Sequence, residues 1–212
     1  MDLLTELTAH YTELENLVPD IQSATGIIIT TYKSGGKVLT CGNGGSAADA
    51  EHIVGELLKS FEVERPLTPE LEKAIRSYCP DDAPLFTQQL QMPLPAIALT
   101  AHPSFSTAFA NDVQGELVFA QQLLGLAKRG DTLIALSTSG NSENVVLAVK
   151  LARALEIGTV GLTGREGGLL GDLCDVCIKT PTEITYRAQE YHLAIYHAMC
   201  RIIERRFFEP VR

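Results

Sequence analysis

The stretch KVLTCGNGGSAADAEHIVGE, residues 37–56, predicts a short strand, a glycine-rich loop and a helix in succession. Val38, Leu39 and Cys41 supply the apolar side chains of a buried strand. The glycines that follow let backbone amides approach a bound group closely, and we expect Ser46 to cap the next helix. Such a unit binds anions at a helix N-terminus, so this stretch predicts a ligand site.

The same helix carries two residues that could bind a metal or transfer a proton. His52 and Glu56 are four residues apart and therefore lie on one helix face, about 6 Å apart along the axis. At that spacing an imidazole nitrogen and a carboxylate can share one metal ion or one proton path. We therefore expect the chemistry of the protein to begin here.

Composition favours one filled domain, residues 1–212, with a small ligand. Of the 212 residues 45% are hydrophobic, and mean hydropathy is +0.09. The 17 Lys and Arg against 26 Asp and Glu give a net charge of −9, which argues against nucleic acid or an anionic membrane as partner. An anionic substrate would need local help from amides, helix ends or a metal.

The sequence also predicts a soluble, cytoplasmic protein. Residues 1–17 hold acidic side chains and no basic segment before an apolar run, so they do not resemble a signal peptide, and no stretch has membrane-spanning length. An odd number of scattered cysteines suits a reducing compartment with free thiols. The single CxxC, Cys174 to Cys177, lacks a second pair and does not open a helix, so we expect neither a redox nor a metal role for it.

Two segments lie outside the regular alternation of strands and helices. An N-terminal helical arm, residues 1–34, is expected to be helical over 3–32, with Pro19 ending or kinking its first part, and to pack across the sheet or on another protomer. The helix that carries Glu56 should run out near Phe61. An insertion at about residues 62–93, rich in charge and proline, is expected to be a surface excursion with one helix from Thr68 to near Ser77. Its simplest role is a lid or interface element without chemistry.

From Leu94 onward, strand and helix patterns alternate. This alternation predicts right-handed crossovers and a parallel sheet with helices on both faces, an α/β doubly wound fold. The expected strands are 95–100, 131–137, 159–164 and 176–180, and the expected helices are 104–110, 115–127, 143–155, 168–173 and 184–208.

A second polar loop, STSGNS at residues 137–142, follows one of these strands and precedes a helix. Converging hydroxyls and amides at a helix N-terminus are the arrangement that a phosphate requires. A capped loop in water would have the same composition, but two such loops at the ends of parallel strands favour a ligand crevice.

The last helix carries Gln189, His192 and His197 among apolar positions. A lone helical histidine is usually a satisfied core or surface group, which is our interpretation of His192. Gln189 and His197 are eight residues apart, about 12 Å along a helix, so one helix would not easily bring both to one metal. If both take part, we expect a neighbouring protomer to supply one of them.

These motifs, in this order, resemble the sugar isomerase (SIS) domain family, and within it the phosphoheptose isomerases. GNGGSAADAEHIVGE, AND at 110–112, STSGNS, GLTG and the Gln189–His197 helix carry the resemblance over about residues 37–204. It implies a three-layer sandwich around a five-stranded parallel sheet, flavodoxin-like or Rossmann-like. It also implies a homotetramer with active sites between subunits.

The resemblance further implies roles for individual residues. It gives a Zn²⁺ site with one ion per active site, and Glu56 and His197 as the acid–base pair. The reaction it implies is conversion of sedoheptulose 7-phosphate to D-glycero-D-manno-heptose 7-phosphate through an enediol, which needs a base, an acid and stabilisation of negative oxygen. The implied zinc ligands are His52, Glu56, Gln189 and His197, and the implied substrate contacts are Asn43, Gly44, Gly45, Ser46, Asn111, Asp112, Ser137, Thr138, Ser139, Ser142 and Gln189.

Two other classes of function remain open from the residues. A non-catalytic SIS-domain protein could bind a phosphosugar or a replication initiator, although the relative that does the latter lacks a carboxylate at the position of Glu56. Gly42, Gly44 and Ala47 also fit a dinucleotide-binding fingerprint loosely, with Glu62 at about the ribose-binding distance. A helix bearing His52 and Glu56 after the loop argues against the dinucleotide.

Overall fold

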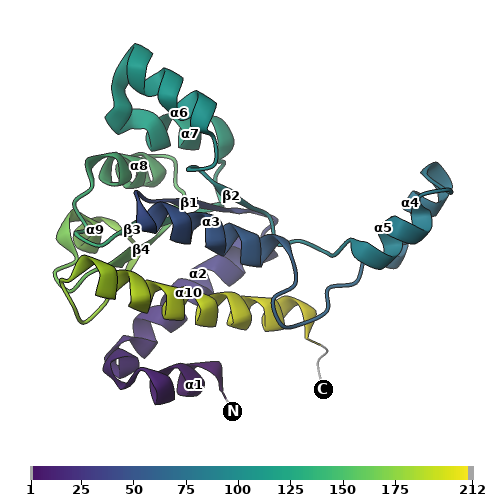
Figure 1. Ribbon diagram of the computed structural model, residues 1–212, viewed down its shortest axis with the longest axis horizontal. Coiled ribbons are helices and arrows are strands. Elements are labelled where there is room, and N and C mark those ends of the chain that lie inside the picture. The colour runs from purple at the N-terminus through teal and green to yellow at the C-terminus, as the bar shows by residue number, and fades with distance from the viewer. Residues whose placement is uncertain (1, 210–212) are drawn as a thin grey trace.

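Five parallel strands form one sheet in the computed structural model, which describes residues 2–209 (Figure 1). Their order is β2-β1-β3-β4-β5, and Val38 is in register with both Ala96 and Thr132. The chain first moves from β1 to one edge and then returns to the other side, so the order reverses between β1 and β3. Doubly wound sheets bind ligands at this switch point. The strands are β1 (Val38–Cys41), β2 (Ala96–Ala98), β3 (Thr132–Ser137), β4 (Gly158–Thr163) and β5 (Val176–Lys179).

Helices cover both faces of the sheet and give the predicted three-layer sandwich (Figure 1). α1, α2, α3 and α10 cover the face of Val38, Ile134 and Leu162, whereas α7, α8 and α9 cover the face of Leu39 and Leu133. No helix within residues 2–209 is both long and apolar enough to cross a membrane. The α-helices are α1 (Leu3–His10), α2 (Val18–Lys33), α3 (Gly45–Leu58), α4 (Pro69–Tyr78), α5 (Ala83–Gln89), α6 (Pro103–Phe109), α7 (Val118–Leu126), α8 (Glu143–Ala154), α9 (Gly168–Leu173) and α10 (Thr185–Phe208); η1 (Thr12–Leu17) and η3 (Gly115–Leu117) are 3-10 turns and η2 (Ala110–Gln114) is a π-helical turn.

The N-terminal arm is helical, but its break does not lie where the sequence predicted. α1 ends at His10, and Pro19 lies in the first turn of α2 instead of ending the preceding segment. Proline is tolerated there because the first N–H groups of a helix have no partner within it. The arm packs on its own chain, with Leu4, Leu7 and Ile21 in the same apolar cluster as α10.

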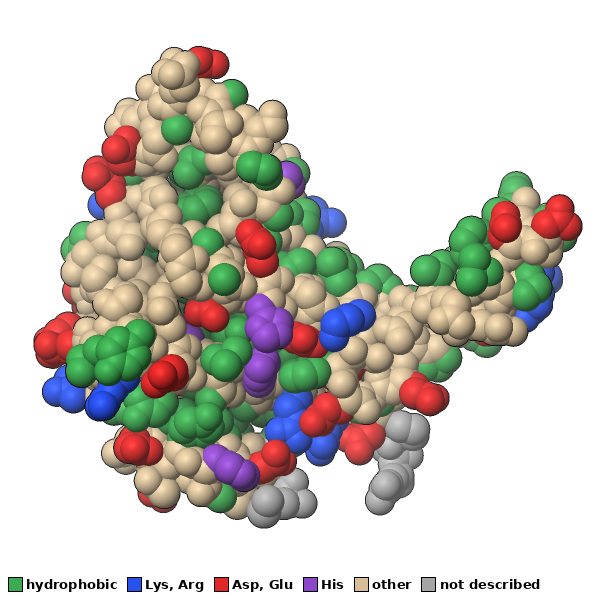
Figure 2. Space-filling view, viewed as in Figure 1, with side chains coloured by type: hydrophobic (Ala, Val, Ile, Leu, Met, Phe, Trp, Pro, Cys, Tyr) green, Lys and Arg blue, Asp and Glu red, His purple; other side chains and the backbone are tan. Residues whose placement is uncertain are grey.

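The insertion forms a helical hairpin that extends from the body of the protein (Figures 1 and 2). Thr68 accepts a hydrogen bond from the Leu71 amide and caps α4 as predicted, whereas α5 was not predicted. The hairpin closes at its base, where the Met92 amide donates to the Arg65 carbonyl at 2.8 Å. Large apolar side chains remain exposed on it, namely Leu71, Tyr78, Leu85 and Leu90.

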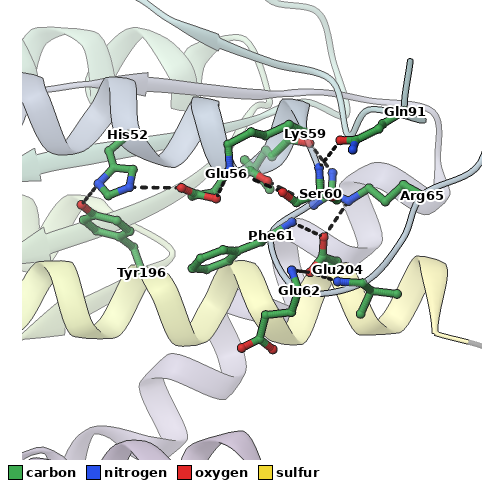
Figure 3. A network of polar contacts seen from close by, with 12 residues as sticks. His52, Glu56, Lys59, Ser60, Phe61, Glu62, Arg65, Gln91, Tyr196 and Glu204 are labelled. Carbon is green, nitrogen blue, oxygen red and sulfur yellow. Dashed lines mark hydrogen bonds and ion pairs between the residues drawn. The ribbon is translucent and has the colours of Figure 1, made fainter. Parts of the chain in front are cut away.

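A buried ion pair anchors the base of this hairpin (Figure 3). Arg65 and Glu204 are 2% and 0% exposed, and the Arg65 Nε lies 2.8 Å from the Glu204 Oε1. The Glu204 carboxylate also accepts hydrogen bonds from the backbone amides of residues 61, 62 and 63. These bonds turn the chain away from α3, which explains why α3 ends at Leu58 and not near Phe61 as predicted.

The buried pair predicts a large effect of substitution at Glu204. Burial opposes ionisation of this carboxylate, but the amides of Phe61 and Glu62 and the Arg65 guanidinium more than compensate, so the pKa of Glu204 lies below its usual 4.5. Glu204→Gln leaves Arg65 charged and buried without a counter-charge, so we expect the free energy of unfolding in urea to fall by about 3 kcal/mol. Glu62→Gln is the matched control, since Glu62 pairs with Arg201 and Arg205 near the surface and should change stability by less than about 1 kcal/mol.

The same pair predicts how the difference depends on pH. When the pKa of a carboxyl group is lower in the folded protein than in the unfolded chain, the group stabilises the fold at pH values above its pKa in the unfolded chain. This stabilisation is lost as the pH falls through its pKa in the folded protein. The unfolding free energies of the native protein and Glu204→Gln should therefore converge as the pH falls below 4.5 toward and through that lowered value. A difference below about 1 kcal/mol at pH 7 would contradict this account.

Candidate functional site

The first glycine loop leads directly into α3. Gly44 has a φ of +56°, a left-handed conformation that favours glycine, and it precedes the first helical residue, Gly45. Ser46 therefore lies inside the helix, 4% exposed, and its side chain makes no capping hydrogen bond, so the predicted cap is wrong. The amides at the start of α3 have no side-chain cap and can bind an anion.

Three hydroxyl groups converge in the second polar loop. The Ser137 Oγ lies 2.9 Å from the Ser142 Oγ and 3.4 Å from the Ser139 Oγ. Ser142 immediately precedes α8, and its hydroxyl does not cap that helix. Hydroxyls and the amides of a helix N-terminus thus face one position, which suits a phosphate group.

The path of this loop is fixed by glycine. Gly140 has a φ of +66°, and a Cβ placed there would collide with the backbone carbonyl of Gly167. The Gly140 carbonyl in turn accepts a hydrogen bond from the Leu170 amide at 3.0 Å, so the start of α9 supports the loop from behind. A side chain at position 140 would push the loop off this support and move its hydroxyls.

A pair of amide side chains joins the two loops. The Asn43 and Asn144 side chains exchange two hydrogen bonds of 2.8 and 2.9 Å, across the boundary between β1 and β3. Asn43, predicted to bind substrate, thereby lies beside the N-terminus of α8. Asn144 was not predicted, because nothing in the sequence indicates which residue on α8 faces the first loop.

His52 and Glu56 form the predicted pair (Figure 3). The His52 Nε2 lies 3.2 Å from the Glu56 Oε1, and the Lys59 Nζ lies 2.9 Å from the other carboxylate oxygen. The Glu56 side chain is 10% exposed and that of His52 is 43% exposed. Glu56 is thus largely shielded from water, while His52 remains open to a ligand.

His197 lies beside this pair on the facing helix α10. Its ring centroid is 5.0 Å from that of His52, and its Nε2 is buried without a hydrogen-bond partner within residues 2–209. Burial, with the nearby His52, lowers the pKa of His197, so the neutral imidazole is favoured. The ring also lines a groove between α1 and α10, and histidines gather at the middle of this face (Figure 2).

Gln189 does not join that group. Its side-chain amide packs against Gly45 so closely that a Cβ there would collide with it. It lies about 12 Å from His197 along α10, as the eight-residue spacing requires. His192, between them, is fully buried near the Thr163 carbonyl, at 3.2 Å, in agreement with its interpretation as a core residue.

The predicted residues therefore fall into separate groups in one chain. Glu56 follows Gly45 by eleven residues on a single helix, so about 16 Å of helix separate the predicted acid–base pair from the loops. Asn111 and Asp112 lie exposed on η2, where the Asn111 amide donates to Asp112 at 2.8 Å. Only the two loops and Gln189 are brought together at the switch point.

The donors fit zinc in kind but are not assembled by one chain. Imidazole nitrogens and a carboxylate are the ligands zinc prefers, and the unpartnered Nε2 of His197 suits a ligand. Among residues 2–209, however, no group of three or more His, Cys, Asp or Glu side chains is arranged to hold a metal. Closing the set therefore requires movement or a donor from another copy.

The CxxC pair has no sign of reactivity. Cys174 and Cys177 are free thiols, and burial raises the pKa of both, that of Cys174 to about 12. A thiol must ionise to attack or to bind metal, so these values agree with a structural role.

Comparison with known proteins identifies the family. The sequence profile of the SIS domain matches residues 4–78 and 85–164, most of the chain. The chain therefore belongs to the SIS-domain family.

Relatives of high coverage share one activity. The chain is 37% identical to a phosphoheptose isomerase of Akkermansia muciniphila over 94% of its own length and 92% of the relative's, and 43% identical to one of a Nitratiruptor species over 91% and 89%. Among solved structures, the phosphoheptose isomerase GmhA of Neisseria gonorrhoeae superposes with a TM-score of 0.74 and is 34% identical in sequence to this protein. The match covers 95% of this chain and 94% of the GmhA chain. The phosphoheptose isomerase of Francisella tularensis has a TM-score of 0.76 and 32% identity, covering 95% and 93%.

The hydroxyl cluster predicts the effect of removing one of its members. Ser142→Ala deletes one hydroxyl facing the anion position, so we expect binding of inorganic phosphate, measured by calorimetry, to weaken roughly tenfold. Ser23→Ala is the control, because the Ser23 hydroxyl is exposed on α2 and donates to the Pro19 carbonyl of the same helix. Equal phosphate affinity in both variants would place the anion elsewhere.

Proposed function

We propose that this protein is a phosphosugar ketose–aldose isomerase that converts sedoheptulose 7-phosphate to D-glycero-D-manno-heptose 7-phosphate, in the cytoplasm. Its similarity to phosphoheptose isomerases over nine-tenths of the chain supports the reaction class. The observation that carries the proposal is the occurrence, in one chain, of a phosphate-type loop and a shielded Glu56 beside His197.

In this proposal the two loops hold the phosphate and the sugar chain. Ser137, Thr138, Ser139 and Ser142 bind the phosphate oxygens, and the α8 N-terminus adds a favourable potential. Asn43 and the amides of Gly44 and Gly45, with Ser46 behind them, line the sugar, together with Gln189, which packs on Gly45. Asn111 and Asp112 bind sugar hydroxyls.

The acid–base pair moves protons between C1 and C2. The Glu56 carboxylate takes a proton from C1 while His197 gives one to the oxygen on C2, which forms the enediol. Glu56 then returns its proton to C2 while His197 takes the proton from the oxygen on C1, so the carbonyl forms there. Because burial lowers the pKa of His197, its protonated ring is a stronger acid than an ordinary imidazolium and gives up its proton more readily.

A zinc ion forms part of the proposal. His52, Glu56, Gln189 and His197 are the side chains that would hold it, and the bound ion would polarise the sugar carbonyl and hydroxyl oxygens. Two observations support this role. The Nε2 of His197 has no hydrogen-bond partner among the described residues, and the His52 side chain is 43% exposed.

The active site is proposed to be shared between copies in a homotetramer. About 16 Å of α3 separate Glu56 from the loop of the same chain, whereas the reacting carbons and the phosphate belong to one small molecule. A loop from one copy and the Glu56–His197 pair from another would satisfy both requirements.

Glu56→Gln tests the catalytic assignment. Turnover of sedoheptulose 7-phosphate should fall at least about a hundredfold, because the base is lost, while phosphate affinity and thermal unfolding stay near native values, because Glu56 lies away from the phosphate loop and Gln has nearly the same shape. Glu51→Gln, on the exposed side of α3, is the control and should keep full turnover. Retained turnover in Glu56→Gln would remove Glu56 from the mechanism.

The shared site predicts complementation between two impaired variants. Mixed and re-equilibrated Glu56→Gln and Ser142→Ala proteins should regain part of the turnover, since some sites would join two native halves. No recovery, despite exchange of subunits shown by mass spectrometry, would contradict sharing. If the native protein binds the phosphosugar without turning it over, the non-catalytic alternative holds.

Gly45→Ala tests the place of Gln189. The added methyl group would collide with the end of the Gln189 side chain, which can swing away, so we expect the melting temperature to hold. The KM for the sugar phosphate should rise or kcat should fall by about tenfold, because Gln189 leaves its position. The control is Gly55→Ala on the same helix, where a methyl group meets nothing within 4 Å. Equal kinetics in the two variants would exclude Gln189 from the site.

A further inference from the structure

A tyrosine on α10 links His52 to a carboxylate one turn earlier on α3. The Tyr196 hydroxyl lies 2.8 Å from the His52 Nδ1 (Figure 3). It also lies 3.3 Å from the Asp49 Oδ1, and Tyr196 is 2% exposed. The other Asp49 oxygen is buried and has no partner among the described residues. The contacts run in one line, from Asp49 through Tyr196 and His52 to Glu56.

The direction of the protons follows from the hydrogen-bonding capacity of each group. A phenol has one proton to donate, and an ionised carboxylate can only accept. If Tyr196 donated to His52, the half-buried Asp49 carboxylate would lose the side-chain donor that the structure gives its Oδ1, while its buried Oδ2 already has no partner among the described residues, which is costly. Tyr196 therefore donates to Asp49, and its oxygen accepts the Nδ1 proton of His52.

This direction determines what His52 presents to Glu56. With the proton on Nδ1, the Nε2 carries a lone pair and faces the Glu56 Oε1 at 3.2 Å. Two acceptors at that distance repel each other unless a positive charge lies between or beside them. Lys59 supplies one on the far side of the carboxylate, at 2.9 Å from Oε2, and no ion pair within residues 2–209 places a Lys or Arg at Nε2.

We propose that Tyr196 is a positioning residue that holds the Nδ1 proton of His52, so that the bare Nε2 is directed toward Glu56 as a ligand for a divalent cation. The inference rests on the proposed function for the identity of the cation. Metal-bound histidines generally donate their second nitrogen to an outer partner, which fixes the tautomer and the ring orientation. Here the outer partner is Tyr196, whose own hydroxyl proton is donated to Asp49.

The first test reads the tautomer directly, in metal-free protein. Nitrogen-15 NMR of His52 at pH 8 should show the proton on Nδ1 in the native protein. In Tyr196→Phe the population should move toward Nε2–H, which can donate to Glu56. Tyr191→Phe makes the same change on the same helix, where the ring of Tyr191 packs on Tyr11, and should leave His52 unchanged.

The second test measures zinc affinity by competition with a chromogenic chelator. Tyr196→Phe should weaken binding about 10- to 100-fold, with the melting temperature preserved because the ring still fills its place in the core. Tyr191→Phe should bind as the native protein does. Asp49→Asn should also weaken binding, and combined with Tyr196→Phe it should add little, because both act through one line of contacts.

The outcomes separate this inference from the function on which it rests. A proton on Nε2 in the native protein, or an unchanged tautomer in Tyr196→Phe, would overturn the role of Tyr196. The predicted tautomers in a native protein without zinc affinity would support the positioning role and overturn zinc as the cation.

Discussion

The fixed length of α3 is the constraint on which the rest of the structure depends. One rigid helix begins at the glycine loop and carries His52 and Glu56 on its second half. Its N-terminus must lie at the switch point of the sheet, because β1 ends there, and Glu56, eleven residues further along, then lies about 16 Å away. The two loops and the proposed acid–base pair are thus held apart as firmly as they are held in place.

α10 packs against α3 and complements this arrangement. It runs beside α3 and places a different group at each level, namely Gln189 at Gly45, Tyr196 and His197 at His52, and Glu204 where α3 ends. The buried Arg65–Glu204 pair therefore also sets the register of α10 against α3. A shift of α10 by one turn would separate all these pairs together.

Much of the fold could be predicted from the sequence, because apolar strands and the helices between them repeat along the chain. The two loops, the His52–Glu56 pair and the core position of His192 also follow from local patterns. Pro19 and Ser46 were assigned wrongly, because helix starts depend on tertiary contacts that local propensity does not contain. Asn144 and Tyr196 were missed because their partners are 101 and 144 residues away in sequence, and a lone Asn or Tyr carries no spacing signal.

The hairpin of α4 and α5 leaves and rejoins the body at one point, where the Arg65 carbonyl meets the Met92 amide. The chain on either side of that bond follows the same path whether the segment between is long or short. Evolution can therefore lengthen, shorten or remove this appendage by joining two residues that already touch, without disturbing the helices that carry the chemistry. Such a closed base gives the protein a place where new surface can be acquired independently of catalysis.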